Sequence, residues 1–218
     1  PRDYYVQLHN TSGAKDKLTH AGVYGINMSK NTLEDLYGIN IDYTIKVGFK
    51  AVTGIVDAID GVEINSDQEM SLKTEGENAK TCHYTVGKQH VDGECALRFA
   101  RERKSYASGD RHRGENQQQV LTAIINKISS NKGYLLKWAE ILGAVEGYVD
   151  ISASFEDVAK FAHDAIKHPK NWQIESISVD GTGSMQPTYS MGSRPLYVMI
   201  PDESTVAAAK AKIAKYLK

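Results

Sequence analysis

The stretch TLEDLYGINIDYTIKVGFKAVTGIVDAIDGVEI, residues 32–64, alternates between helical and strand patterns and thereby indicates the fold class. Leu33 and Leu36 share one helical face, and Gly38 follows at a position that suits the end of a helix. Residues 41–49 then place apolar side chains at every second position, which is the periodicity of a strand. A helix over 51–61 and a short strand over 62–64 repeat this order. The alternation favours an α/β fold.

The C-terminal part of the chain continues the alternation. Its patterns predict a helix over 152–169, strands over 172–181 and 194–201 with a loop over 181–193 between them, and a helix over 204–217. Ser154 and Asp157 have the spacing of a capping box at the start of the first of these helices. Because there is no long linker and no repeat, we expect a single domain. Its mixed central β-sheet would be flanked by helices on both faces, as an α-β-α sandwich.

Composition limits the classes of function. The 218 residues carry a formal net charge of −1, with 41% hydrophobic and 24% charged residues. Proteins bind nucleic acids and membrane surfaces through a broad area of positive charge on their own surface. A net charge of −1 does not provide such a field over the whole protein, so we expect neither as a general partner. No apolar run is long enough to span a membrane. The opening PRDYYVQL resembles a strand without an initiator Met or a signal peptide, so we expect the chain to be a fragment that lacks an upstream part.

Arginine is concentrated in one segment. Residues 98–119, RFARERKSYASGDRHRGENQQQ, hold five of the seven arginines, and residues 98–113 carry a net charge of +4. Guanidinium groups bind phosphate oxygens in bidentate fashion and stay charged when partly buried. In extended backbone Arg101 and Arg103 would point the same way. The segment therefore predicts a site for phosphate or pyrophosphate, although a salt-bridged basic surface is the alternative.

A helical wheel refines this interpretation. With Asp110 as N-cap, the helix that follows carries the apolar stripe Val120, Leu121, Ile124 and Ile128. Arg113 and Gln117 fall within about 40° of one another and near the centre of that stripe, whereas Arg111 falls on the far side. A charge on a buried face needs compensation, and few acidic residues are near. An external anion is the simplest partner. The stripe itself suits an apolar tail attached to that anion, or is simply protein core.

These motifs resemble the LytR-CpsA-Psr family, and its streptococcal capsule-synthesis branch in particular. RFARER, then GDRHR, then QQQVL and the opening PRD match the family's order and spacing, and the resemblance covers most of residues 1–130. Two positions depart from the pattern: Asn116 stands where the family often has Arg, and Asp60 where glycine is usual. The resemblance implies that residues 1–218 are the family's catalytic domain without its first strands.

The resemblance also implies an activity. Members are membrane-anchored, extracytoplasmic enzymes of Gram-positive bacteria. They transfer a glycopolymer, such as capsular polysaccharide or teichoic acid, from a polyprenyl pyrophosphate carrier to peptidoglycan, with Mg²⁺ nearby. A hydroxyl of the acceptor would displace the lipid phosphate at the phosphorus nearer the sugar. We expect the metal ligands and the membrane anchor to lie upstream of residue 1.

Family residues carry over to matching positions only. The head-group contacts would be Arg2, Arg101, Arg103, Arg113 and Gln117, with Lys17, Arg98 and Arg111 as secondary candidates. Asp3 joins the first group as the candidate base of the predicted catalytic set. The lipid tail would follow Val120, Leu121, Ile124 and Ile128. Cys82 and Cys95 allow two buried thiols or one disulfide, and because an extracytoplasmic location favours oxidation we predict the disulfide.

Two other functions use the same residues. A polyprenyl pyrophosphate phosphatase would bind the same head group and use water as the nucleophile. A non-catalytic module for lipid phosphates or polysaccharides would bind without turnover. A nucleic-acid partner is not expected, because the basic segment is short and no aromatic residues are interleaved with it.

Overall fold

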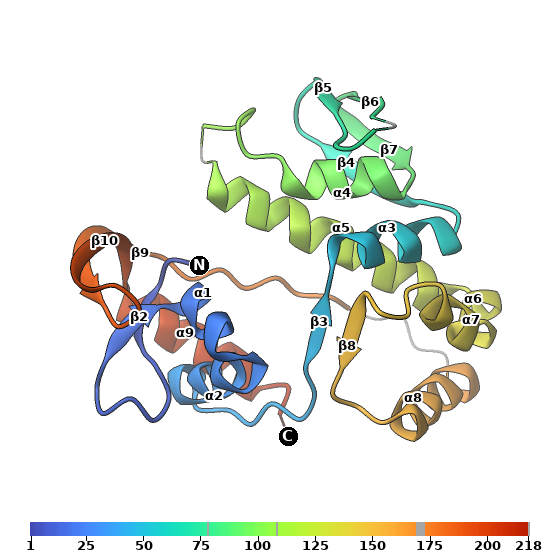
Figure 1. Ribbon diagram of the computed structural model, residues 1–218. Coiled ribbons are helices and arrows are strands. Elements are labelled where there is room, and N and C mark those ends of the chain that lie inside the picture. Colours follow the sequence, from blue (N-terminus) through green and yellow to red (C-terminus); the bar gives the residue numbers. More distant parts are fainter. Residues whose placement is uncertain (78, 108, 169–172, 218) are drawn as a thin grey trace. The chain divides into compact units, whose positions relative to one another are not determined.

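The chain is described by a computed structural model over residues 1–77, 79–107, 109–168 and 173–217 (Figure 1). It divides into two compact units. Unit 1 comprises Pro1–Thr44 and Ser176–Lys218, and unit 2 comprises Ile45–Glu175. Each unit is described by itself below, and the expectation of a single domain stays a prediction.

Unit 1 combines strands of mixed direction with helices. Its elements are β1 (Tyr5–Gln7), β2 (Lys15–Lys17), α1 (Leu18–Ala21), the 3₁₀ helix η1 (Gly22–Tyr24), α2 (Ile26–Tyr37), β9 (Gly181–Thr188), β10 (Gly192–Pro201) and α9 (Glu203–Ala214). β1 pairs with β2 and β10 with β9, both antiparallel. A parallel bridge between Tyr4 and Met199 connects the N-terminal segment to β10. Tyr4, Val6 and Val206 form the buried core, so α9 packs against the strand side of the unit.

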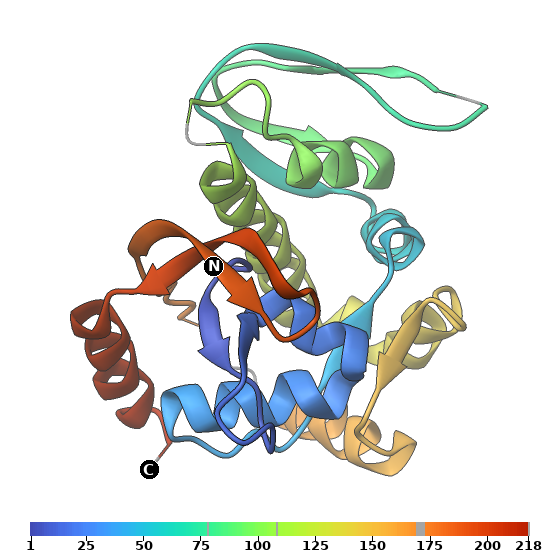
Figure 2. The ribbon, with the colours of Figure 1, turned by 60° about the vertical axis from the view of Figure 1, so that its left-hand side comes forward.

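Unit 2 contains the arginine-rich segment. Its elements are β3 (Ile45–Val47), α3 (Phe49–Ala58), β4 (Val62–Ser66), β5 (Met70–Lys73), β6 (Thr81–Tyr84), β7 (Gly87–Val91), α4 (Gly93–Arg101), α5 (Asp110–Ser130), α6 (Lys132–Leu136), α7 (Trp138–Gly143), β8 (Val149–Ile151) and α8 (Phe155–Lys167). The antiparallel pairs are β4 with β7, β5 with β6, and β3 with β8. In Figure 2 the β5–β6 hairpin reaches out past α4.

The core of unit 2 lies between α3, α4, α5 and the β4–β7 ladder. Val56, Ile64, Phe99 and Val120 are among its buried side chains. A disulfide joins Cys82 on β6 to Cys95 on α4, as predicted. The phenol of Tyr84 donates to the carbonyl oxygen of Cys95 at 2.8 Å, next to this link. The β5–β6 hairpin is therefore fixed to the helix that carries two of the candidate arginines.

The helix predictions agree with the structure. α2 covers the predicted segment and ends at Gly38, which has the left-handed conformation (φ 65°, ψ 43°) that suits glycine at a helix end. Ser154 and Asp157 form the predicted capping box at the start of α8. Pro169, expected just beyond that helix, lies outside the described residues. The α/β prediction is confirmed at the level of these elements.

Three strand predictions need correction. The strand expected over 41–49 is only β3, three residues long. Residues 173–180 form no strand, and Trp172 lies outside the described residues. The expected loop over 181–193 contains β9, whose residues pair with β10 from Gly181↔Pro201 to Thr188↔Gly192. Gly, Ser and Pro in this segment indicated a loop, but cross-strand pairing outweighed these local preferences.

The structure also differs from the predicted central sheet, because the strands form separate ladders. Among the described residues the hydrogen-bonded ladders are two-stranded, and the Tyr4–Met199 bridge adds one parallel contact between β1's segment and β10. The mixture of antiparallel ladders with a parallel bridge matches the expected mixed strand directions. The short lengths of β1, β2, β3 and β8 limit how far each ladder extends.

Candidate functional site

The segment that carries Arg98 and Arg101 is a helix, not the extended backbone that the sequence predicted. Asp92 caps α4 by accepting a hydrogen bond from the backbone N–H of Cys95 at 3.0 Å. Ala96 and Phe99 face the core, and Arg101 is the last helical residue. An N-cap aspartate ahead of an Ala- and Leu-containing run was the signal that could have identified this helix. Arg101 and Arg103 therefore do not share one face of a strand.

Arg98 is engaged within the protein. Its Nε donates to the carbonyl oxygen of Lys73 at 2.9 Å, and a terminal guanidinium nitrogen lies 2.7 Å from a carboxylate oxygen of Glu102. Glu102 is 2% exposed. Its other oxygen accepts from the backbone N–H groups of Lys104 and Ser105 at 2.7 and 2.9 Å. Burial by itself raises the pKa of Glu102, but the hydrogen bonds from Ser105 and the Arg98 charge outweigh it, so that pKa is lowered.

Arg101 occupies a more open position. One guanidinium nitrogen lies 2.9 Å from Glu75 on the β5–β6 loop, and the side chain of Glu75 is 74% exposed. The guanidinium carbon also lies 4.4 Å from the ring centroid of Phe49, a cation–π geometry. An exposed ion pair contributes little free energy. An incoming anion can therefore replace Glu75 at low cost while Phe49 holds the guanidinium in place.

α5 begins one residue earlier than the wheel assumed, with Gly109 rather than Asp110 at the N-cap. Arg113 is half-buried and Arg111 is exposed, as predicted. Gln117, however, is exposed, so its predicted inward direction is wrong. Its neighbour Asn116 is 2% exposed instead, and its side-chain nitrogen donates to the carbonyl oxygen of Phe99 at 3.2 Å. This bond places the first turns of α5 against the last turn of α4.

The predicted tail-binding stripe is mostly core. Val120 is 3% exposed, and Ile124 and Ile128 are half-buried against the same cluster. Leu121 differs, because 57% of it is exposed, and Ile125 beside it is 37% exposed. Only this outer edge of the stripe offers apolar surface to a ligand.

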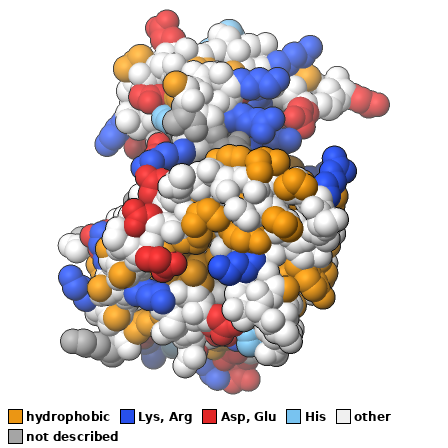
Figure 3. Space-filling model, turned by 90° about the vertical axis from the view of Figure 1, so that its left-hand side faces the viewer, with side chains coloured by type: hydrophobic (Ala, Val, Ile, Leu, Met, Phe, Trp, Pro, Cys, Tyr) orange, Lys and Arg blue, Asp and Glu red, His pale blue; other side chains and the backbone are white. Residues whose placement is uncertain are grey.

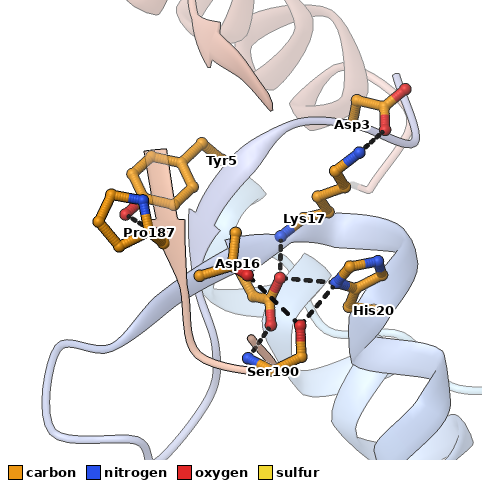
Figure 4. Close-up of polar contacts among 8 residues, drawn as sticks. Asp3, Tyr5, Asp16, Lys17, His20, Pro187 and Ser190 are labelled. Atoms are coloured by element: carbon orange, nitrogen blue, oxygen red, sulfur yellow. Dashed lines mark hydrogen bonds and ion pairs between the residues drawn. The ribbon is translucent and has the colours of Figure 1, made fainter. Parts of the chain in front are cut away.

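The remaining candidates lie in unit 1. Lys17 and Asp3 form an ion pair, with 2.9 Å between the ammonium nitrogen and a carboxylate oxygen (Figure 4). Both side chains are less than one-fifth exposed. Arg2 is exposed, and its carbonyl oxygen accepts from the backbone N–H of Thr19 at 2.9 Å. The start of the chain is thereby tied to α1 in a fixed conformation.

Sequence reasoning missed Asp16, which is fully buried beside this pair. Its carboxylate accepts from the backbone N–H groups of Lys17 and Ser190, both at 2.7 Å, and lies 2.7 Å from Nδ1 of His20 (Figure 4). Burial alone would raise the pKa of Asp16, but the hydrogen bonds from Ser190, Lys17 and His20 together lower it. The carboxylate is thus held charged and connects β2 to the turn between β9 and β10. The signal that could have found it is the i, i+4 spacing of Asp16 and His20.

An exposed apolar face adjoins Lys17. The ammonium nitrogen of Lys17 lies 6.0 Å from the ring centroid of Tyr197 on β10. Met185 and Tyr189 on the same hairpin are more than half exposed, as is Tyr197, and hydrophobic side chains gather on this side of the molecule in Figure 3. A cation beside exposed aromatic and methionine side chains suits a ligand that joins an anionic group to an apolar chain.

The candidates thus form two groups. Arg2, Asp3 and Lys17 belong to unit 1, whereas the arginines of α4 and α5 and Gln117 belong to unit 2. That the two groups meet around one ligand stays a prediction. Within the described part of the chain, no three His, Cys, Asp or Glu side chains gather in a way that could hold a metal ion. No helix over the described residues is long and apolar enough to cross a membrane.

Comparisons with known proteins place this chain in a family. The LytR_cpsA_psr family model matches residues 1–212. The polyisoprenyl-teichoic acid–peptidoglycan teichoic acid transferase TagU of Bacillus mycoides is 31% identical over all of this chain and 65% of its own length. TagU of Enterococcus faecalis is 30% identical over 85% of this chain and 58% of its own length. The chain thus spans about two thirds or less of the length of these relatives.

Solved structures agree with the fold. TagV of Bacillus subtilis superposes with a TM-score of 0.79 at 24% identity, covering 100% of this chain and 81% of that one. A TagT structure bound to LIIa-WTA gives 0.75 at 23% identity, covering 99% and 76%. At such identities the likeness concerns the fold, and it confirms the α/β class. Because the family model extends over nearly the whole length, the chain belongs to the LytR-CpsA-Psr family.

Proposed function

We propose that this chain transfers a glycopolymer from a polyprenyl pyrophosphate carrier to peptidoglycan. The observation that supports the proposal is that Arg101 ends α4 and Arg113 lies near the start of α5, while the Asn116–Phe99 hydrogen bond joins these two helices. That Arg101, Arg103 and Arg113 bind one head group together is part of the proposal. Guanidinium groups and the free N–H groups of a helix start together suit a pyrophosphate. Its relatives, named as teichoic acid transferases, support this substrate class.

The arginines would act on charge and not on protons. A hydroxyl of the acceptor forms a new P–O bond at the phosphorus nearer the sugar, and the bond from that phosphorus to the bridging oxygen breaks. The lipid phosphate leaves with the bonding electrons, and a carboxylate base takes the hydroxyl proton; Asp3 is the candidate on this chain. Negative charge grows on the leaving phosphate, where preorganised guanidinium groups stabilise it. Arginine stays protonated throughout.

The polymer and the location complete the proposal. Capsular polysaccharide and teichoic acid are both polymers that a pyrophosphate carrier presents in the same way, and we propose one of these as the cargo. The Cys82–Cys95 disulfide supports an oxidising, extracytoplasmic location. A membrane anchor upstream of residue 1 would hold the enzyme near its lipid-linked donor.

A matched pair of variants tests the arginine site. Arg113→Ala removes a half-buried guanidinium, and Arg111→Ala removes an exposed one two residues away on the same helix. Loss of a charge-assisted contact costs about 1.5–3 kcal/mol, so we expect Arg113→Ala to weaken pyrophosphate-lipid binding about tenfold or more. Arg111→Ala should change it less than about twofold, in line with a screened surface charge. Equal effects would contradict the proposed site.

The lipid itself is best sought in protein purified from bacteria. Mass spectrometry of an organic extract should detect a polyprenyl phosphate or pyrophosphate, and the triple variant at Arg101, Arg103 and Arg113 should lose it. Transfer of labelled glycopolymer to peptidoglycan then separates transferase from phosphatase, because a phosphatase would release inorganic phosphate without an acceptor. A wild-type extract free of such lipids, together with absent transfer, would refute the proposed function.

A further inference from the structure

A groove of about 690 Å³ lies on unit 2, away from the arginines. Its floor is the outer face of the β4–β7 ladder, and its wall is the second half of α5. A volume of this size falls within the range of about 300–1,000 Å³ that is typical of binding sites for small molecules. The groove is built from residues of one unit only, so its shape does not depend on unit 1.

The floor is a set of four polar side chains on neighbouring strands. Glu63 pairs with His90 across the ladder, and Asn65 pairs with Lys88. Because side chains alternate along a strand, Val62 and Ile64 face the core while these four face outward, and all four are exposed. Within the described part of the chain, the side chains of Glu63, Lys88 and His90 take part in no hydrogen bond or ion pair. Their donors and acceptors are thus open to a ligand.

The wall supplies hydroxyl and amide groups. Thr122, Asn126, Ser129 and Ser130 line it from α5. On a helical wheel the mean direction of these four residues lies about 120–180° from the direction of Arg113. The groove and the arginines therefore use different faces of the same helix. Among the residues that line the groove there is no arginine. This chemistry is unlike that of a pyrophosphate site.

The helix and the strands are locked together at both ends of the groove. Gln119 on α5 binds both backbone groups of Asn65: its carbonyl oxygen accepts at 2.5 Å and its amide nitrogen donates at 3.1 Å. Lys127 donates to the carbonyl oxygens of Asp60 and Gly61, each at 2.8 Å. A ligand therefore meets a wall and a floor that are already fixed relative to each other, which reduces the entropy cost of binding.

The chemistry of the groove indicates its ligand. One glutamate, two lysines and one histidine give no strong net field, and hydroxyl and amide groups provide both donors and acceptors. A phosphate would need a concentration of positive charge, whereas a polymer rich in hydroxyl and N-acetyl groups needs such mixed hydrogen-bonding partners. We infer that this groove binds a glycan strand. Whether that strand belongs to the acceptor or to the sugar part of the donor rests on the proposed function.

Binding of glycans to the full chain tests the inference directly. The probes are soluble oligosaccharides of alternating N-acetylglucosamine and N-acetylmuramic acid, capsular oligosaccharides, and inorganic pyrophosphate as a reference for the arginine cluster. Asn126→Trp fills the groove from its wall, and Lys88→Ala removes a cation from its floor. Lys46→Ala is the matched control, because Lys46 is an exposed strand lysine of the same unit outside the groove.

We expect calorimetric titration to show about a tenfold or larger loss of glycan affinity in Asn126→Trp and about a threefold or larger loss in Lys88→Ala. Lys46→Ala should bind glycan like the wild type, and pyrophosphate binding should be unchanged in all three variants. Affinity for the first oligosaccharide assigns the groove to the acceptor, and affinity for the second assigns it to the donor.

Two results would overturn the inference. One is a wild-type chain that binds neither oligosaccharide, and the other is wild-type affinity in both groove variants after thermal melts have shown them folded. The proposed function fails separately, if Arg113→Ala leaves pyrophosphate binding intact. Glycan binding that persists in that case still supports the groove, so the two failures are distinguishable.

Discussion

Replacing Arg98 with alanine distinguishes an arginine that holds the fold together from one that holds a ligand. In the structure its guanidinium bridges the Lys73 carbonyl on the β5–β6 hairpin and the buried carboxylate of Glu102 just past the end of α4. The substitution removes both bonds and leaves a carboxylate that is 2% exposed with one charge-assisted partner fewer. We therefore expect the main effect of Arg98→Ala to be a loss of stability of unit 2, and not a loss of ligand binding.

The magnitude follows from the partners that remain. A hydrogen bond to a charged group contributes about 1.5–3 kcal/mol, and full loss of the partner of a buried charge costs about 3–5 kcal/mol. Glu102 keeps its bonds from Lys104 and Ser105, and the Arg98 side chain is 24% exposed, so the lower range applies. We expect a loss of about 2 kcal/mol, which lowers the Tm by about 4–8 °C in a protein of this size.

The loss should depend on pH. The pKa of Glu102 lies below its ordinary value of 4.5 in the folded protein. Its stabilising contribution is therefore fully present above pH 4.5 and is lost as the pH falls through the folded pKa. Because Arg98 contributes to that lowering, the difference between wild type and Arg98→Ala should be largest near pH 7 and should shrink below pH 4.5. In a Glu102→Gln background, Arg98→Ala should cost less stability above pH 4.5, where Glu102 is ionised, and the two backgrounds should converge at low pH.

Urea unfolding followed by circular dichroism measures these differences, with Arg111→Ala as the control for loss of an arginine from the same segment. A midpoint that does not change in Arg98→Ala would refute the structural role assigned to this side chain. If the same variant also lost pyrophosphate binding, Arg98 would instead be a ligand contact.

Three further predictions concern stability. Replacing Cys82 and Cys95 with serine should cost about 3 kcal/mol, because their 13-residue separation closes a short loop; the control is wild type treated with a reductant, which should fall to the same midpoint. Gly61→Ala should lower the free energy of unfolding by at least about 1–3 kcal/mol, because φ is +77° and a Cβ would lie 2.7 Å from the Val91 carbonyl oxygen. Gly114 has open space around it, so Gly114→Ala should instead stabilise α5 by up to about 1 kcal/mol. Ser154→Ala should cost about 1 kcal/mol through loss of the α8 capping box, and an unchanged thermal midpoint would contradict that role.

Elements with local causes were predictable from the sequence. α8 begins at its capping box, and α2 ends at a left-handed glycine, because the signals lie within a few residues of the boundary they set. β9 was not predictable in this way. Its Gly, Ser and Pro residues have no preference for extended backbone, and they form a strand because β10 provides hydrogen-bonding partners along their length.

The candidate site shows the same division. The concentration of arginine and the exposed position of Arg111 were predictable from composition and periodicity. The inward position of Asn116 in place of Gln117 was not, because Asn116 faces inward only where the carbonyl of Phe99 on α4 accepts a hydrogen bond from its amide. Arg98 was ranked as a possible head-group contact, yet Glu102 stands four residues later. That spacing indicates an ion pair once the segment is known to be helical.

The double hydrogen bond between Gln119 and Asn65 also limits the access of other chains to the edge of β4. It satisfies the N–H and C=O of Asn65, which point away from β7 and would otherwise be open to another chain. Exposed strand edges of this kind recruit further strands and begin aggregation. A single amide side chain here takes the position that an intruding strand would need. The free edge of β4 is thereby closed at Asn65, next to the last residue of the strand, without a third strand.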